Sequence, residues 1–154
     1  GILGSQVISG FESEIAAIPA LAFFIPLITA MGGNVGVQSS AIVVQSLAKG
    51  DFMFASIFKR VSKEMVVALI NGVLLSTIIY IISAFFEGQT LALVVSLSLF
   101  TVIIFASVFG TVIPLLLDKY KIDPALATGP FVTTLNDILG LFIYFTIGML
   151  LYHL

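Results

Sequence analysis

Long stretches without a charged residue alternate with short charged segments along the whole chain. A helix needs about 20 apolar residues to cross the hydrocarbon core of a bilayer, and the long stretches reach or approach that length. Residues 1–10 are apolar but too short to cross alone, and we expect them to be the last turns of a first helix. The pattern predicts a single all-α transmembrane domain over residues 1–154, with further helices over 15–48, 65–86, 91–117 and 123–154.

Prolines interrupt two of the predicted helices. Pro19 and Pro26 fall within the second helix, and Pro114 lies near the end of the fourth. A proline inside a helix leaves a backbone carbonyl without its donor and kinks the axis, which membrane proteins tolerate where neighbours or water satisfy that carbonyl. We therefore expect a kinked second helix and a bend in the last turn of the fourth.

The composition supports a membrane protein and argues against several other classes. Hydrophobic residues make up 60% of the chain and charged residues 9%, against roughly 25% in soluble domains, and the mean hydropathy is +1.23. The chain has no cysteine and a single histidine, His153, so disulfides and zinc sites are not expected. The sequence contains no basic, aromatic patch for nucleic acid, no phosphate-binding loop and no paired nucleophile and base. We expect no cofactor and no enzymatic activity.

The charges of the connecting segments predict the orientation in the membrane. All 6 Lys and Arg residues lie in segments 49–63 and 118–123, whereas acids alone, Glu87 among them, mark the opposite ends of the helices. Short loops rich in Lys and Arg stay in the cytoplasm. We therefore expect a multi-pass protein of the cell membrane with these two segments inside, and a short interfacial helix over residues 52–58.

After Asp123 at its start, the last predicted helix carries a single further acid, Asp137, and no charged residue follows it. A charged side chain inside a membrane costs about 2.5–3.5 kcal/mol on insertion scales, so it usually faces water or a partner. Residues three and four apart share a helix face, and this face is small or polar, with Pro130, Thr133, Thr134 and Gly140 beside Asp137. One carboxylate among hydroxyls predicts a cation site. In the alternative interpretation, Asp137 caps a helix or forms a hydrogen bond to a neighbouring helix.

A second polar segment, Gly32–Ser40, lies at membrane depth in the second predicted helix. It contains three glycines, and the amides of Asn34 and Gln38 share one helix face. Glycine exposes backbone carbonyls and lets helices approach closely. We interpret the segment as the lining of a polar path or gate. The alternative is helix packing through small residues, of which Gly32 and Gly36 form one pair.

These two polar segments carry a resemblance that covers nearly the whole chain. The residues that carry it are Pro26, the segment Gly33–Ser40, Asp123, Pro124, Ala125, Gly129, Pro130, Thr133, Thr134, Asp137 and Gly140. With these residues the chain resembles the membrane domain of the MgtE family of magnesium channels and transporters. The resemblance implies a five-helix bundle that works as a homodimer in the lipid bilayer.

The resemblance also implies roles for individual residues. In that family the second and fifth helices line an ion path at the dimer axis, and the aspartate that matches Asp137 holds hydrated Mg²⁺. Further residues of both helices would line the path: Ala30, Gly33, Asn34, Val37, Gly129 and Thr133. Val37 occupies a position that is often polar in the family, so an apolar side chain here replaces an amide ligand.

The chemistry of Mg²⁺ agrees with this assignment. Mg²⁺ loses water reluctantly and is usually held by one or two carboxylates and several waters, which fits one Asp137 from each chain of a dimer. We predict a Mg²⁺ channel or transporter with Asp137 as its central cation site and Mg²⁺ as the transported ion. Two alternatives stay open: a proton- or sodium-coupled carrier with a glycine-broken, moving helix, and a non-transporting scaffold subunit whose polar residues hold helices together.

Overall fold

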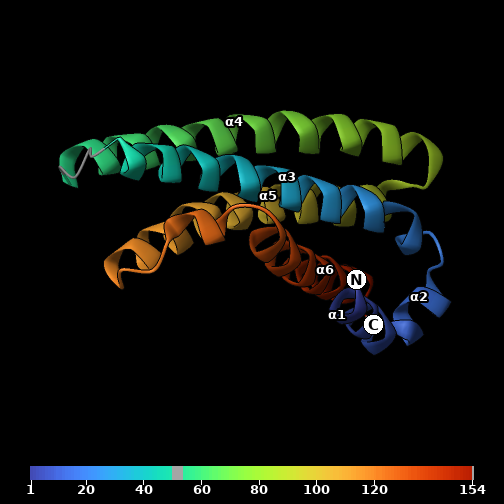
Figure 1. The fold of residues 1–154 in the computed structure, drawn as a ribbon. Helices are drawn as coiled ribbons and strands as arrows, with labels where there is room; N and C mark the ends of the chain where they lie inside the picture. The colour runs from blue at the N-terminus through green and yellow to red at the C-terminus, as the bar shows by residue number, and fades with distance from the viewer. Residues whose placement is uncertain (50–53, 154) are drawn as a thin grey trace.

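A computed structural model describes residues 1–49 and 54–153, and the regular structure among them is helical. Six α-helices and one 3-10 helix follow one another along the described residues (Figure 1). They are α1 (Ile2–Gly10), α2 (Glu12–Ala17), α3 (Leu21–Ala48), α4 (Phe54–Phe86), α5 (Gln89–Lys119), the 3-10 helix η1 (Pro124–Ala127) and α6 (Pro130–Tyr152). The predicted all-α fold is confirmed.

Four segments among the described residues are long and apolar enough to cross a membrane. They are Leu21–Ala48, Val61–Phe86, Gln89–Lys119 and Pro124–Tyr152. Helix α1 has 9 residues, which is too short for a crossing on its own. The five-helix count therefore stays a prediction, as does the kink at the internal prolines.

The predicted second helix, 15–48, is divided in the structure. Helix α2 ends at Ala17, Ile18 has extended backbone angles (φ −134°, ψ 79°), and α3 begins only at Leu21. The residue before a proline disfavours the helical region, and Pro19 has no N–H to donate to a preceding carbonyl, so the break falls at this point. Pro26 lies inside α3, which continues through it.

Helix α4 begins earlier than the uncharged stretch 65–86 predicts. It starts at Phe54, so the separate interfacial helix expected over 52–58 is, from Phe54 onward, the first part of α4. Residues 52 and 53 lie outside the described residues, and the predicted inner loop 49–63 lies partly outside them. Lysine and glutamate are good helix formers, so charge marks where the apolar part of α4 begins and not where its helix begins.

The predicted last helix, 123–154, is also divided. The Asp123 carboxylate accepts a hydrogen bond from the Ala125 amide at 2.9 Å, as expected for a cap, but the helix that it caps is the short η1. Gly129 follows with φ +87°, a conformation that L side chains rarely adopt. Helix α6 begins one residue later, with Pro130 at its first position.

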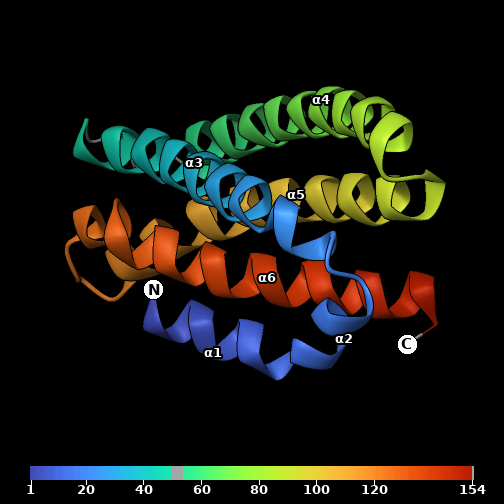
Figure 2. The same cartoon turned by 90° about the vertical axis from the view of Figure 1, so that its right-hand side faces the viewer.

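Helix α5 lies at the centre of the bundle and packs against α3, α4 and α6 (Figure 2). It approaches α3 closely where Gly110 meets Gly36, because a Cβ added to Gly110 would collide with the Gly36 carbonyl oxygen. The core around it combines fully buried residues of three long helices: Leu21, Ile28, Val94, Leu99, Ile103, Tyr144 and Phe145.

The two ends of the bundle differ in charge. The C-terminal ends of α3 and α5 lie at the same end, together with the starts of α4 and α6, whereas α2, the α4–α5 turn and the C-terminus lie at the other (Figures 1 and 2). Lys49 and Lys119 therefore share one end, and Glu12 and Glu87 lie toward the opposite one. This arrangement is compatible with the predicted topology, in which the basic end is cytoplasmic.

Candidate functional site

The start of α6 is held in place on both sides of Gly129. Before it, the buried Ser40 hydroxyl of α3 donates to the Ala127 carbonyl oxygen at 3.0 Å and ties η1 to α3. After it, the Thr133 hydroxyl lies 3.3 Å from the Gly129 carbonyl oxygen and 3.1 Å from that of Pro130. The single proton of this hydroxyl is thus directed to the helix backbone, and its oxygen keeps lone pairs for another partner.

Asp137 lies one turn beyond Thr133, and both residues face Gly33 of α3. A Cβ built on Gly33 would lie 3.7 Å from Thr133 Cγ2 and 3.9 Å from Asp137 Oδ1. The structure therefore brings together Gly33, Thr133 and Asp137, three of the predicted site residues. Gly33 is buried, whereas Asp137 is partly exposed.

The Asp137 carboxylate has no hydrogen-bond donor among the residues that the structure describes. The interpretation in which it caps a helix or bonds to a neighbouring helix therefore has no partner in this part of the chain. A carboxylate at membrane depth is costly unless a cation, water or a donor compensates its charge. The surroundings of Asp137 therefore fit a carboxylate that binds a ligand from outside the chain.

The other predicted lining residues lie around this group of three. Ala30 and Asn34 are exposed on α3, and Val37 is partly exposed. Gly129 is partly exposed as the N-cap of α6, one turn before Thr133. These residues continue the site along the surface of α3 and α6, but they do not add a second carboxylate to it.

A cavity of about 190 Å³ opens beside Asp137 and extends between α1, α3 and α6. Three hydroxyls line it with the carboxylate, those of Ser5, Thr29 and Thr134. Ser5 donates its proton to the Gly1 carbonyl oxygen at 3.0 Å, and Thr29 donates to that of Ile25 at 3.1 Å. Their oxygens therefore remain acceptors, and the cavity has room for several waters of about 30 Å³ each.

Comparison with known protein families identifies the family of this chain. A family model described as MgtE, divalent cation transporter, matches residues 25–147. The chain belongs to the MgtE family. This confirms the resemblance carried by the two polar segments, and together with the four long apolar helices it makes the chain part of a multi-pass membrane protein.

Three relatives of this MgtE-family chain bear the name magnesium transporter MgtE. The protein from Bacillus subtilis is 40% identical over 154 residues, that from Thermus thermophilus 38% over 152, and that from Enterococcus faecalis 35% over 149. The alignments cover 99%, 98% and 96% of this chain but 34%, 34% and 33% of the relatives. The chain thus spans about a third of the length of the curated relatives that it matches.

Gly140, which the sequence places on the polar face of this MgtE-family domain, lies on the buried packing face of α6 instead. Gly140 is buried, and a Cβ on it would lie 3.5 Å from Val102 and 3.7 Å from Ile28, so it serves helix packing. Each residue turns a helix by about 100°, so position 140 is closer in angle to position 136 than to 137. The face that packs on α3 and α5 includes Val132, Asn136, Gly140, Tyr144 and Gly148, all buried.

Sequence reasoning missed two hydroxyl residues that line the cavity beside Asp137, Ser5 of α1 and Thr29 of α3. Thr29 lies four residues before Gly33 and so shares its helix face, a signal that was present in the sequence. Ser5 carried no such signal, because only the packing of α1 against α6 brings it to the cavity.

A second polar contact in this MgtE-family domain joins three helices away from Asp137. Ser39 of α3 is fully buried and lies 3.3 Å from Glu64 Oε1 of α4 and 3.3 Å from the Ser107 hydroxyl of α5. A serine hydroxyl has one proton, so an ordered chain runs from Ser107 to Ser39 and ends on the carboxylate. Glu64 is therefore an internal acceptor as well as part of the charged segment.

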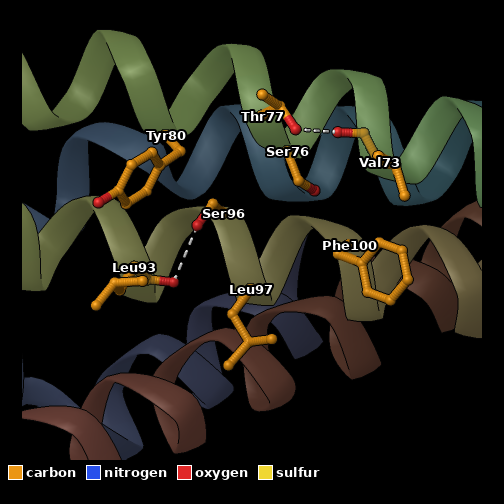
Figure 3. Close-up of a pocket in the computed structure, with 8 residues that line it drawn as sticks. All are labelled: Val73, Ser76, Thr77, Tyr80, Leu93, Ser96, Leu97 and Phe100. Carbon is orange, nitrogen blue, oxygen red and sulfur yellow. Dashed lines mark hydrogen bonds between the residues drawn. The ribbon is translucent and has the colours of Figure 1, made fainter.

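A larger hollow of about 390 Å³ lies between α4 and α5, and its chemistry differs (Figure 3). Thr77 donates to the Val73 carbonyl oxygen at 2.7 Å and Ser96 to that of Leu93 at 3.2 Å, as the dashed lines show. The lining contains hydroxyls and apolar groups but no carboxylate: Val73, Ser76, Thr77, Tyr80, Leu93, Ser96, Leu97 and Phe100. The hollow lacks the charge that a cation site needs.

Proposed function

We propose that this chain is the ion-conducting part of a Mg²⁺ channel or transporter and that Asp137 is its central cation site. The observation that carries the proposal is the partly exposed Asp137 carboxylate, which faces Gly33 and Thr133 inside a membrane-spanning segment. The names of the three relatives, all magnesium transporters, support Mg²⁺ as the ion.

The oxygen groups near Asp137 suit a cation that keeps its water. Mg²⁺ prefers octahedral oxygen ligands, dehydrates reluctantly and usually binds one or two carboxylates directly. The hydroxyl oxygens of Thr29, Thr133 and Thr134 can accept hydrogen bonds from the waters of such an ion. A calcium site would require six to eight oxygen ligands, and the chain offers a single carboxylate here.

The path runs between two copies of the chain in this proposal. The described residues of one chain contain no group of three or more His, Cys, Asp or Glu residues that could hold a metal. A two-fold axis beside α3 and α6 would bring a second Asp137 to the site. The outward face of α3 supports this position of the axis, because beyond the exposed Phe23 near its start the exposed residues along this face are small or polar: Pro26, Ala30, Asn34 and Gln38.

Mg²⁺ flux into liposomes tests the proposal. Wild-type protein and Asp137→Asn are reconstituted side by side and compared by a Mg²⁺-sensitive dye, with Glu87→Gln as the control because it removes the same charge from an exposed turn. We expect loss of most flux in Asp137→Asn and no change in Glu87→Gln. Flux that needs an opposing H⁺ or Na⁺ gradient would instead favour a coupled carrier.

A further inference from the structure

We propose that Asn136 is a positioning residue for cation binding: its amide sets the rotation and height of α6 against α3 and thereby holds Asp137 beside Gly33. The inference rests on the proposed function, in which Asp137 binds the ion. It concerns a different side chain, one that does not face the cavity beside Asp137 and that contacts α3 instead.

Asn136 fits into a notch formed by two glycines of α3. Its side chain is 3% exposed, and Nδ2 donates to the Gly32 carbonyl oxygen at 3.3 Å. A Cβ added to Gly36 would overlap Nδ2 and would lie 3.1 Å from the Asn136 Cγ. The Asn136 Cβ lies 3.8 Å from a Cβ built on Gly32. The amide therefore fills the space that the missing Gly36 side chain leaves, whereas Val102 Cγ1, 2.9 Å from a Cβ on Gly32, fills the space beside Gly32.

The same glycine segment thus serves two neighbouring faces. Gly32 and Gly36 receive Asn136, whereas Gly33, one residue further round the helix, faces Thr133 and Asp137. Asn136 and Asp137 are likewise consecutive, so their side chains diverge by about 100° around the α6 axis. When the amide is seated in its notch, the carboxylate can face only the Gly33 side. A turn of α6 that unseats Asn136 moves the carboxylate with it.

Two further hydrogen bonds join α6 and η1 to α3, but they lie toward the ends. The buried Tyr144 hydroxyl donates to the Leu21 carbonyl oxygen at 2.9 Å, and Ser40 donates to that of Ala127 at 3.0 Å. Tyr144 is seven positions after Asp137, about 10 Å along the helix. The Asn136–Gly32 hydrogen bond is the one next to the carboxylate, and its loss shifts Asp137 most directly.

An amide is the side chain that this notch requires. Leucine has a similar size but no N–H for the Gly32 carbonyl oxygen. Aspartate would place a second buried charge against that oxygen without a donor, which is costly in a low-dielectric setting. Groups that hydrogen-bond to a metal ligand and orient it typically change metal affinity by 10–100-fold when they are removed, and Asn136 orients Asp137 through the backbone of α6.

The test compares Asn136→Leu with Tyr144→Phe in the reconstituted protein. Each variant removes one buried hydrogen bond between α6 and α3 and keeps the bulk of the side chain. We expect the half-saturating Mg²⁺ concentration to rise by about 10-fold or more in Asn136→Leu. In Tyr144→Phe, thermal stability falls but half-saturation stays within a factor of about two, since that bond is remote from Asp137. If leucine prevents insertion, Asn136→Ala is measured instead.

A double-mutant cycle with Asp137→Asn separates positioning from general destabilisation. If Asn136 acts through Asp137, adding Asn136→Leu to Asp137→Asn causes no further loss of affinity. Equal half-saturation in wild type and Asn136→Leu, or losses that multiply in the double variant, would overturn the inference. Asp137→Asn with wild-type affinity would instead refute the proposed function itself.

Discussion

At the scale of single residues, the absent side chain of Gly33 is as important as the Asp137 carboxylate. The contacts that a Cβ on Gly33 would make, 3.7 Å to Thr133 and 3.9 Å to Asp137, are ordinary van der Waals distances. An alanine therefore fits, whereas a branched side chain extends into the space beside the carboxylate.

We expect Gly33→Val to reduce Mg²⁺ flux much more than Gly33→Ala. The valine methyls occupy the position of water molecules around a hydrated ion, while the alanine variant keeps stability within about 1 kcal/mol of wild type. Liposome flux, normalised to the amount of inserted protein, measures the difference. Equal flux in both variants would mean that no ion passes between Gly33 and Asp137.

Asp137→Glu tests the position of the carboxylate separately from its charge. The extra methylene moves the charge further toward the cavity, so we predict impaired conduction with part of the divalent binding retained. Competition of Mg²⁺ with a reporter cation such as Mn²⁺, followed together with flux, distinguishes binding from passage. Wild-type conduction by the glutamate variant would show that the distance between the carboxylate and Gly33 is unimportant.

At the scale of helices, the structure contains long apolar helices as the sequence predicts, but several of their ends differ from the predicted ones. Uncharged stretches identify the apolar parts of α3, α4 and α5, because the bilayer imposes that pattern. Helix ends depend on backbone hydrogen bonding, which is why Pro19 and Gly129 divide helices that hydrophobicity alone joins. The cost of a charge in a membrane made Asp137 a candidate from the sequence, whereas the contact of Asn136 with Gly32 and Gly36 emerges only from packing.

The crossing of α3 and α5 should tolerate no added atom. A Cβ on Gly110 would collide with the Gly36 carbonyl oxygen, and a backbone cannot move aside as a side chain can. We expect Gly110→Ala to destabilise the protein by about 1–3 kcal/mol, measured by unfolding in detergent. Gly148→Ala is the matched control, because its new Cβ would meet only side chains, at 3.7 Å or more. Equal stability of the two variants would contradict the packing described for this crossing.

At the scale of the whole molecule, the two outer surfaces differ in chemistry. Helix α4 exposes a row of large apolar side chains, including Ile70, Leu74 and Ile78, which suits lipid. The exposed face of α3 instead carries amides and small residues beside Asp137. This contrast favours a partner chain or water at α3, in agreement with the proposed two-fold axis.

Cysteine cross-linking tests that axis in a chain without native cysteine. We expect Asn34→Cys to form a dimer through a short bifunctional reagent in liposomes, since this exposed position on α3 would face its copy. Leu74→Cys on α4, which is 56% exposed, is the control and should remain monomeric. Cross-linking through position 74 and not through position 34 would move the dimer interface to the other side of the molecule.

The most direct test of the central claim is the cation dependence of flux in Asp137→Asn. The variant keeps the size of the side chain and removes one negative charge per chain, so insertion should be as good as in wild type, since a neutral side chain is cheaper to bury. Our account predicts that it loses most Mg²⁺ flux and its preference for Mg²⁺ over K⁺ and Na⁺. Mg²⁺ flux at the wild-type rate and selectivity would contradict the account.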